Sequence, residues 1–361
     1  MQMRFILFLL ILYISIGCET RRAKPGEDDL DMSAILLPVP EYAVLEDSTY
    51  FTWGASPIKG DDGLYHLYYS RWKKKYGFLA WVTHSEIAHA VATDLLGPYK
   101  FKDVALPARG TEFWDGTTTH NPTIHKFGNN YYLYYMGNKG DGVNIKNALN
   151  WTHRNSQRIG VAVSSSPDGP WKRFERPLID VSPDSTAADA LAVNNPSVVK
   201  RPDGKIQMVY KAVARKKPLP FGGPVVHLTA IADSPIGPFV KNPDPIFTKE
   251  NSFFAAEDPY VWCQKNRYYA IVKDMNGEFT KKGRSLALFT SEDGENWTVA
   301  KHTLVSDLIL KWDNGRCDSV YYLERPQLYL ENGHPKALFL AVSPTKENKH
   351  TYNVHIPLKV E

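Results

Sequence analysis

The sequence predicts an all-β protein, a five-bladed β-propeller of four-stranded blades. One observation is a polar or small pair followed by proline, which occurs five times with the prolines 65, 74, 63 and 67 residues apart. Another is the pattern after each proline, where two alternating apolar runs flank a turn rich in Gly, Asp or Asn, as in a β-hairpin. One supersecondary unit repeated at this period indicates blades arranged radially. The five motifs are Ala55-Ser56-Pro57, His120-Asn121-Pro122, Asn194-Asn195-Pro196, Glu257-Asp258-Pro259 and Glu324-Arg325-Pro326.

A third apolar run completes each unit, and in the first four units a glycine-containing turn with an aromatic residue follows it. We expect that aromatic to begin an outer fourth strand and to pack between neighbouring blades. The fifth unit ends after its third strand. The chain before Ser56 is therefore expected to supply the missing outer strand, which closes the ring and leaves no open edge. The aromatics are Tyr99, Trp171, Phe239 and Trp297.

The composition agrees with a large folded domain. Of the 361 residues, 43% are hydrophobic and 12% aromatic, which excludes wholesale disorder. The formal net charge is +4, from 43 basic and 39 acidic residues, so we expect no nucleic-acid partner. Cys263 and Cys317 allow one disulfide, but free thiols fit two cysteines at least as well.

The N-terminus carries a short apolar run, Phe5 to Ile16, after Arg4. A membrane-spanning helix needs roughly 20 apolar residues, so this run is typical of a secretory signal instead. The tetrapeptide Ser15-Ile16-Gly17-Cys18 resembles the lipobox of bacterial lipoproteins. That resemblance implies a signal peptide over 1–17 and a lipidated Cys18 that anchors the protein to a membrane. A polar tether over 18–39 would then lead to the propeller, which the repeat predicts over 40–361. The protein would be an exported lipoprotein of the outer membrane, cell surface or periplasm; an ordinary signal peptide is the alternative.

The five polar pairs should meet around the propeller axis. The first strand of each blade lines the axis, so its first residues gather at one mouth of the channel. Asn121 and Asn195, next to proline, would serve equally well as caps that hold blades together. Glu257 and Glu324 are stronger candidates for function, because two glutamates near an axis repel each other without a task or a cationic partner.

Loops expected at the same mouth mix basic and aromatic residues. The first is RWKKKYGFLAWVTHSE, the second contains Trp151, His153 and Arg154, the third contains Lys211 and the fourth Lys273. Aromatic faces suit the C–H faces of sugar rings, and Lys and Arg suit carboxylate or sulfate groups. A merely solvated loop face is the alternative interpretation.

The fivefold motif with its SPDGPW and SPIGPF turns resembles the five-bladed glycoside hydrolases, especially family 43 and the related families 32, 117 and 130, from about Pro40 to Val360. The Glu257-Asp258-Pro259 and Glu324-Arg325-Pro326 triplets are similar to the element that carries the general acid in those families. The resemblance implies a hydrolase in which an acid protonates the leaving oxygen and a second carboxylate acts as base or nucleophile.

One position departs from the family pattern. The base aspartate that usually precedes proline in the first blade is Ser56 here. Asp115, six residues before Asn121, is the favoured replacement, and Asp189 holds a similar place before the third blade. Ordinary loop polarity would also explain both.

The roles that follow are an acid at Glu257 or Glu324, a base at Asp115 or Asp258, orientation by His120 and Arg325, and a sugar subsite from the loops. The predicted catalytic residues are Glu257, Glu324, Asp115 and Asp258, and the predicted substrate-binding residues are His120, Asn121, Trp151, His153, Arg154, Asn195, Lys211 and Arg325.

The expected substrate is a plant or algal oligosaccharide or polysaccharide, either sulfated or uronate-bearing or a neutral arabinoside, xyloside or galactoside. The enzyme is expected to act as a monomer and to require no cofactor. The family resemblance leaves room for a calcium ion near the axis at His120 or His227, and no metal ligands are assigned. Two other functions stay open: a glycan-binding lipoprotein without catalysis, and a phosphate-dependent phosphorylase.

Overall fold

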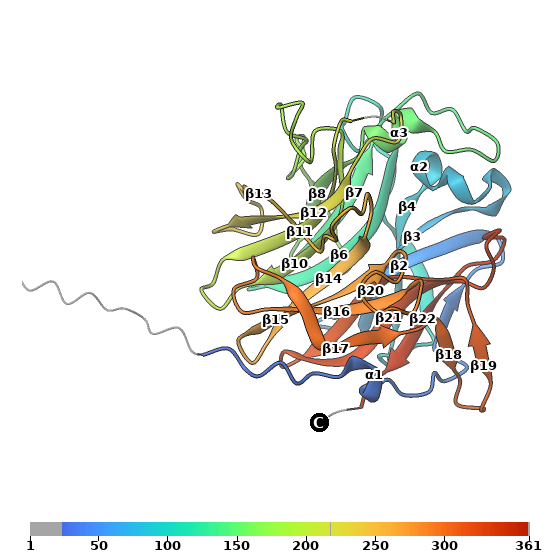
Figure 1. The fold of residues 1–361 in the computed structure, drawn as a ribbon. Coiled ribbons are helices and arrows are strands. Elements are labelled where there is room, and N and C mark those ends of the chain that lie inside the picture. Colours follow the sequence, from blue (N-terminus) through green and yellow to red (C-terminus); the bar gives the residue numbers. More distant parts are fainter. Residues whose placement is uncertain (1–23, 217, 360–361) are drawn as a thin grey trace, which may run out of the picture.

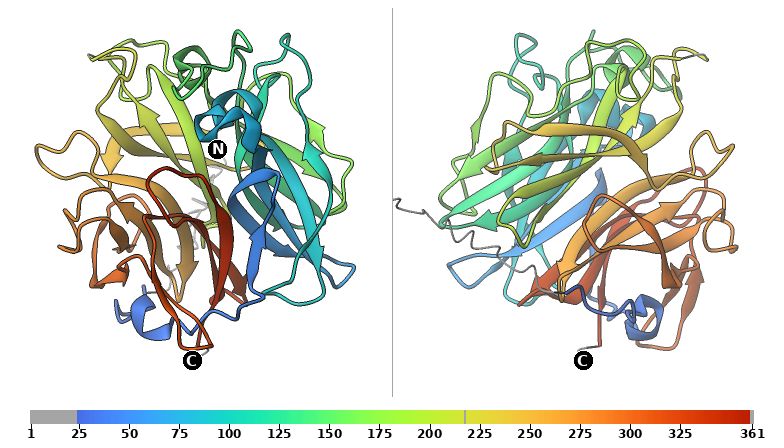
Figure 2. Two further views of the ribbon diagram at one scale, coloured as in Figure 1. Left: turned by 90° about the vertical axis from the view of Figure 1, so that its right-hand side faces the viewer. Right: turned by 60° about the vertical axis from the view of Figure 1, so that its left-hand side comes forward.

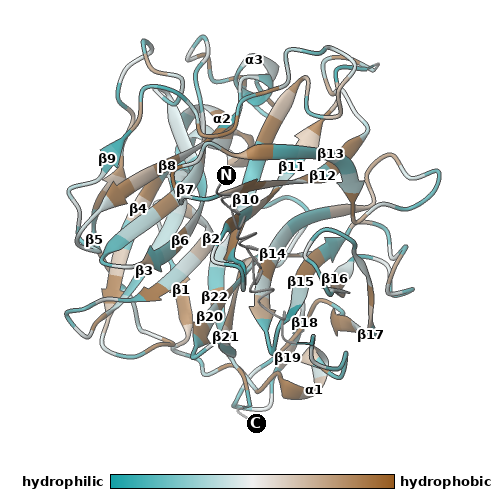
Figure 3. Cartoon of the chain, turned by 90° about the vertical axis from the view of Figure 1, so that its left-hand side faces the viewer, coloured by the Kyte–Doolittle hydropathy of each residue, from teal (hydrophilic) through white to brown (hydrophobic). Residues whose placement is uncertain are grey.

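A computed structural model describes residues 24–216 and 218–359. It shows five four-stranded antiparallel sheets arranged in a ring, so the predicted five-bladed propeller is confirmed (Figure 1). Figure 3 shows the first strands β2, β6, β10 and β14 near the centre and the outer strands β5, β13 and β17 towards the rim. The predicted signal peptide and Cys18 lie outside the described residues. Within the described part of the chain, no helix is long and apolar enough to cross a membrane.

Each blade is a meander whose strands follow the chain from the axis outwards, except that the last blade takes its outer strand from the N-terminal part of the chain. The strands of blades 1 to 3 are β2 (Tyr50–Lys59), β3 (Tyr65–Lys73), β4 (Glu86–Ala92), β5 (Lys100–Leu106), β6 (Thr118–Phe127), β7 (Asn130–Asn138), β8 (Arg158–Ser164), β9 (Lys172–Arg173), β10 (Ala192–Lys200), β11 (Ile206–Val213), β12 (Val225–Ala232) and β13 (Val240–Ile246). Blades 4 and 5 and a small hairpin contain β14 (Ala256–Gln264), β15 (Arg267–Asp274), β16 (Ser285–Ser291), β17 (Thr298–Ser306), β18 (Ile309–Lys311), β19 (Cys317–Ser319), β20 (Tyr322–Glu331), β21 (His334–Ser343), β22 (Tyr352–Pro357) and β1 (Val44–Glu46).

The ring closes as the sequence predicts. Strand β1 pairs antiparallel with β22, with Val44 opposite Val354, and so completes the fifth blade. First strands of neighbouring blades are in contact all round the axis, β20 with β2 included. Closure by a segment far away in the sequence removes the open edges that two adjacent blades would otherwise expose.

The core is divided among the interfaces between blades. One cluster of buried side chains fills each interface, for example Ile87 of blade 1 with Leu133 of blade 2. The aromatic that follows each third strand packs into these clusters, and Tyr99 is itself buried there. Trp171 packs edge-on against Tyr68, with ring centroids 5.6 Å apart. The predicted packing of the turn aromatics between blades is thus confirmed. Cys263 and Cys317 are both free.

The N-terminal segment assigned to a polar tether packs on the propeller in its described part. The amide of Gly26 donates to the carbonyl of Lys265 at 2.8 Å, and Leu30 and Met32 are buried in the cluster between blades 4 and 5. Helix α1 (Met32–Ile35) lies beside the C-terminal end of the chain, where the amide of Lys359 donates to Ile35 (Figure 2). The apolar residues within an otherwise polar segment explain why it is held here rather than exposed.

Every first strand has a β-bulge near its start, where one residue adopts a positive φ. The residues in this conformation are Gly54, Asn121, Asn195, Asp258 and Arg325, with φ between 51° and 60°. In blade 1 the bulge lies between Trp53 and Ser56. The motif of the first blade is therefore Trp53-Gly54-Ala55, two residues before the Ala55-Ser56-Pro57 that the sequence indicates. Ser56 is buried below the bulge, where its hydroxyl donates to the Gln327 side chain at 3.0 Å.

Candidate active site

The bulges arrange two layers of side chains around the axis. The residues with positive φ form an inner ring, consisting of Gly54, Asn121, Asn195, Asp258 and Arg325. The residues just before them form a mouth ring, consisting of Trp53, His120, Asn194, Glu257 and Glu324. The predicted convergence of the polar pairs is therefore what the fold produces, with Trp53 and Gly54 in place of Ala55 and Ser56.

The inner ring is a connected hydrogen-bond network. The amide of Asn121 donates to Asn195 at 2.7 Å, and the amide of Asn195 donates to the carboxylate of Asp258 at 2.6 Å. Arg325, which is buried, reaches the same carboxylate oxygen at 3.4 Å. Gly54 closes the ring, since a Cβ there would lie 3.3 Å from the Asn121 oxygen. These residues join the blades to one another, and three of them also form the floor of a cavity.

The cavity occupies the axis above the inner ring and has a volume of about 130 Å³. Its upper wall comes from the loops at the mouth, which contain η1 (Lys74–Tyr76), η2 (Phe78–Ala80), α2 (Trp81–His84) and α3 (Trp151–Asn155). Helices α2 and α3 lie side by side there (Figure 1). The lining residues are Trp53, Trp72, Phe78, Trp81, His120, Asn121, Met136, Gln157, Asn194, Asn195, Lys211, Glu257, Asp258 and Glu324.

One side of the cavity is aromatic. Phe78 contacts Trp53 edge-on at 5.6 Å, and it contacts Trp72 at 5.5 Å between ring centroids. The ring of His120 stacks on Trp81 at 4.9 Å, and its Nδ1 contacts the Ser85 hydroxyl at 2.7 Å. Burial lowers the pKa of His120 well below its usual value, so this side chain is neutral.

The opposite side of the cavity carries charge. The ammonium of Lys211 lies 2.6 Å from Glu257, and the ammonium of Lys273 lies 3.2 Å from the other oxygen of that carboxylate. Lys273 also contacts Glu324. Two glutamates from neighbouring blades are therefore bridged by one buried ammonium group, which is the cationic partner that their closeness requires.

The surroundings move the pKa values of the two glutamates in opposite directions. Burial alone would raise the pKa of Glu257, but the ammonium groups of Lys211 and Lys273 outweigh it and lower that pKa. Burial raises the pKa of Glu324, and the charges of Glu257 and Asp258 add to the increase against the opposing effect of Lys273. Near neutral pH Glu257 is ionised, and of the two glutamates Glu324 is the one that takes up a proton first.

Asp115 does not line the cavity. It is fully buried elsewhere, with its carboxylate 2.5 Å from Arg109 and accepting a hydrogen bond from the Tyr135 hydroxyl at 2.7 Å. Asp189 has equivalent surroundings one blade further on, with Lys241 at 2.6 Å and Tyr210 at 3.3 Å. Both carboxylates fix the loop that enters a first strand. The geometry therefore does not support the predicted role of Asp115 as base.

The helix α3 supports the mouth without lining the cavity. His153 is buried, with Nδ1 2.8 Å from the Asn138 side chain and Nε2 accepting from the Gly142 amide at 2.9 Å. The guanidinium of Arg154 lies over the ring of Trp151 and donates to the Phe221 carbonyl at 2.8 Å. Trp151, His153 and Arg154, which are predicted to bind sugar, therefore do not line the cavity, whereas Lys211 does.

Lys273 is the functional candidate that the sequence analysis left among the basic loop residues. It lies on β15 directly opposite Glu257, just as Lys211 lies opposite Asn194 on the neighbouring blade. The signal that would have found it is the strand register, because a residue opposite a mouth-ring residue also faces the axis. Trp53 was not predicted for a different reason. The sequence motif was aligned on Pro57, whereas the bulge of the first blade lies between Trp53 and Ser56.

The axial residues do not fit a calcium ion. Calcium takes six to eight oxygen ligands. Here the carboxylates of Glu257 and Glu324 are paired with lysines, and His120 uses Nδ1 for Ser85. His227, the other predicted candidate, is buried in β12 and does not line the cavity.

No protein-family model and no curated protein matches the chain. Solved structures do. Zg3597, a family 117 glycoside hydrolase of the marine bacterium Zobellia galactanivorans, is 20% identical, with a TM-score of 0.62 over 88% of each chain. A thermostable family 43 glycoside hydrolase is 14% identical, with a TM-score of 0.59 over 91% of this chain and 96% of its own. An endo-arabinase from Bacteroides thetaiotaomicron is 13% identical, with a TM-score of 0.55 over 91% and 98%. The chain therefore shares the five-bladed fold of family 117 and family 43 glycoside hydrolases.

Proposed function

We propose that the protein is a glycoside hydrolase that acts on a plant or algal oligosaccharide or polysaccharide through the carboxyl groups of Glu324 and Glu257. The observation that carries this proposal is the pair of glutamates at one cavity wall with pKa values moved in opposite directions. Pairs of carboxyl groups separated in this way supply the acid and the carboxylate that glycosidic cleavage needs. The similarity in fold to glycoside hydrolases of two families adds support.

In this mechanism Glu324 donates its proton to the leaving oxygen of the glycosidic bond. Glu257 stays ionised and stabilises the positive charge that develops on the sugar ring. A water molecule then forms the new bond to the anomeric carbon and gives its proton to the carboxylate of Glu324, which restores the acid. Lys273 holds the two groups at one place and keeps Glu257 charged. Asp258, below them in the inner ring, fixes Arg325 and Asn195 rather than acting on substrate. The mechanism uses no cofactor.

The remaining walls suit a single sugar unit. The aromatic side offers ring faces for sugar C–H groups. The amides of Gln157 and Asn194 bond to each other, but Nε2 of Gln157 and Oδ1 of Asn194 are buried without a partner among the described residues. Buried polar atoms of this kind are expected to find a partner, and a sugar hydroxyl provides one. Lys211, which lines the cavity, and Lys273 are both already paired with Glu257, which favours a neutral sugar at this position.

The test is a screen of purified protein on neutral, uronic and sulfated glycans, with and without phosphate, read by new reducing ends and chromatography. We expect Glu324→Gln and Glu257→Gln to lower turnover by about 10²–10⁴-fold without unfolding the protein. Glu331→Gln, an exposed glutamate on the same strand as Glu324, is the matched control. Near-normal turnover in both cavity variants would remove the proposal.

Two other functions predict different results in the same screen. A glycan-binding protein would bind an oligosaccharide tightly in calorimetry and release no reducing ends. A phosphorylase would act only when phosphate is added. The two glutamates of the cavity wall and their opposed pKa values favour the hydrolase.

The proposal also places the protein in the cell envelope as a lipoprotein attached through Cys18, on the basis of the lipobox-like Ser15-Ile16-Gly17-Cys18. Membrane association that is lost in Cys18→Ala would support this. Release of that variant and of the wild type into the same soluble fraction would contradict it.

A further inference from the structure

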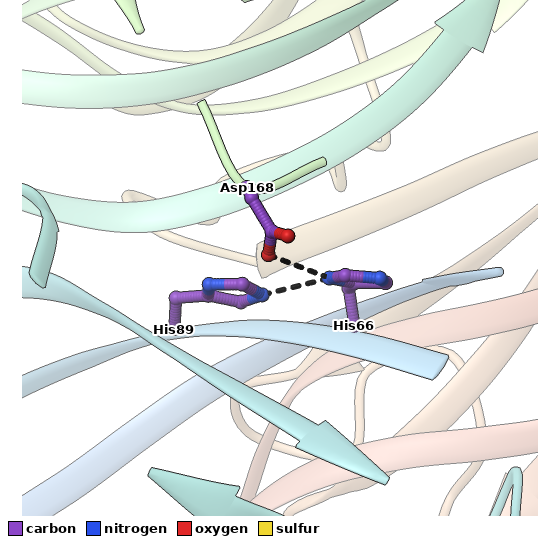
Figure 4. Close-up of side chains that lie close together, drawn as sticks. All are labelled: His66, His89 and Asp168. Carbon is purple, nitrogen blue, oxygen red and sulfur yellow. Dashed lines mark hydrogen bonds and ion pairs between the residues drawn. The ribbon is translucent and has the colours of Figure 1, made fainter. Parts of the chain in front are cut away.

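A second cluster of chemically active side chains lies at the other end of blade 1, away from the cavity. His66 is at the start of β3, just after the β2–β3 turn, whereas the loops that line the mouth follow the end of β3. His89 is on the neighbouring strand β4, and Asp168 belongs to the turn between β8 and β9 of blade 2. Figure 4 shows the three side chains pointing towards one another.

The geometry of the cluster is compact and mostly enclosed. Nδ1 of His66 lies 2.8 Å from Nε2 of His89, and Oδ1 of Asp168 lies 3.8 Å from the same Nδ1. One ligand atom from each residue falls within 4.8 Å of the other two. Both histidines are fully buried, while the Asp168 side chain is 41% exposed and leaves one side accessible to solvent.

The outer nitrogens of both imidazoles face carboxylates. Nε2 of His66 lies 3.1 Å from Asp62, and Nδ1 of His89 lies 3.4 Å from Asp103. A carboxylate only accepts hydrogen bonds, so Nε2 of His66 carries the proton that it donates to Asp62. The inner nitrogens face each other at 2.8 Å, and both can present a lone pair to one bound cation when His89 carries its proton on Nδ1, beside Asp103. Metal-bound histidines commonly have their second nitrogen held by a carboxylate in this way.

We propose that His66, His89 and Asp168 bind a divalent transition-metal ion of the zinc type. Two imidazoles and one carboxylate suit such an ion, whereas calcium and magnesium prefer oxygen ligands. Zinc–nitrogen bonds of about 2.0–2.1 Å place two tetrahedral nitrogen ligands about 3.3 Å apart, so the rings need to separate by only about 0.5 Å. Lys102 contacts Asp168 at 2.5 Å and is 39% exposed, so it can turn into solvent when the ion binds.

The ion would join two blades rather than take part in chemistry at the cavity. Two of its ligands come from blade 1 and the third from blade 2. The ring of Tyr68 stacks on His89 at 4.8 Å and belongs to the hydrophobic cluster between those two blades. Metal binding should therefore stabilise the blade 1–blade 2 interface, and its effect should appear in unfolding whatever the substrate proves to be.

The experiment titrates Zn²⁺ into the chelator-treated full chain and follows calorimetry and thermal unfolding. We expect one saturable site and a rise in Tm of about 3–5 °C at a free Zn²⁺ concentration near 100 times Kd. Asp168→Asn should weaken binding at least about 10-fold and abolish most of the Tm shift. Asp233→Asn is the matched control, because Asp233 is likewise an exposed partner of a lysine, at 3.4 Å from Lys205.

Substitution of Co²⁺ for Zn²⁺ gives an independent readout, since ligand-field absorption in the visible range reports coordination by nitrogen and oxygen. Wild type and Asp233→Asn should show it, and Asp168→Asn should not. Absence of saturable binding would assign the histidine pair to a shared proton and overturn the proposal. Equal affinity in wild type and Asp168→Asn would overturn it as well, because the ion would then be bound elsewhere.

Discussion

Replacing Lys273 by methionine removes the ammonium group that contacts both Glu257 and Glu324 and keeps an unbranched side chain in its place. The Lys273 side chain is only 8% exposed, so water cannot readily take over its role. Loss of one partner of a buried ion pair costs about 3–5 kcal/mol. Glu257 keeps Lys211 at 2.6 Å, which places the expected loss near the lower end, about 3 kcal/mol. The free energy of unfolding should fall by that amount at pH 7.

The loss should depend on pH in a defined direction. Lys273 lowers the pKa of Glu324, so its removal raises that pKa further. A carboxyl group with a raised pKa in the folded state stabilises the fold when protonated, and this contribution is lost as pH rises through the folded-state pKa. The deficit of Lys273→Met should therefore shrink as the pH is lowered from 7. Denaturant unfolding at several pH values measures it, and Lys301→Met, at an exposed position of β17, is the control.

A double variant separates this charge effect from a simple packing defect. Glu324→Gln removes one of the two carboxylates, so Lys273→Met/Glu324→Gln leaves Glu257 paired with Lys211 alone. We expect the double variant to recover at least about 1 kcal/mol relative to the sum of the single changes. Additive losses, or a Lys273→Met protein within about 0.5 kcal/mol of wild type, would refute the bridging role of Lys273.

Three further predictions test the site and its frame. If Glu324 is the acid, kcat/KM should fall as pH rises through the raised pKa of Glu324. Because the pKa of Glu257 is lowered, kcat/KM should not fall on the acidic side at any pH above about 4.3. A profile whose only loss of activity is on the acidic side, at about pH 6, would show that the acid and the ionised carboxylate are assigned the wrong way round. Gly54→Ala should lower the free energy of unfolding by about 1–2 kcal/mol more than Gly128→Ala does. Both glycines have φ +60°, but only Gly54 has atoms of inner-ring residues, those of Asn121 and Arg325, close to its Cβ position. Equal losses of stability in the two variants would contradict the close packing of the inner ring. Asp115→Asn should destabilise the fold by about 3 kcal/mol and leave turnover per folded molecule unchanged, and a turnover defect would restore Asp115 as the base.

The fold could be predicted because its signal is repeated. Five motifs at similar spacing, each followed by a hairpin, allow few arrangements other than blades around an axis. The register of the first blade could not be read in the same way. There the bulge needs a positive φ, which Gly54 supplies without strain, and no proline follows it directly. Pro57, three residues later, gives a false alignment that moves the motif by two residues.

The position of a site residue could be predicted where the residue stands on a strand, because the strand fixes the direction of the side chain. It could not be predicted where the residue stands in a loop between strands. Glu257 and Glu324 stand on first strands, so the ring places both of them at the mouth. Asp115 lies in an irregular segment and His153 in the short helix α3 of a mouth loop, and their side chains turn towards buried partners that only the tertiary structure brings close. The position of Lys273 could also have been predicted, because it lies opposite Glu257 in a regular pair of antiparallel strands.

The family resemblance implies a base aspartate in the first blade, which this chain lacks. The cavity nevertheless keeps two carboxyl groups, and the first blade contributes aromatic side chains instead. Trp53 takes the mouth-ring position of blade 1, and Trp72 and Trp81 extend the same wall. The two glutamates come from blades 4 and 5, which are neighbours in the ring. Carboxyl groups thus gather on one side and aromatic faces on the other. A sugar stacked on the aromatic wall would turn its other side towards Glu257 and Glu324, so the aromatic residues of blade 1 would bind substrate while blades 4 and 5 carry the chemistry.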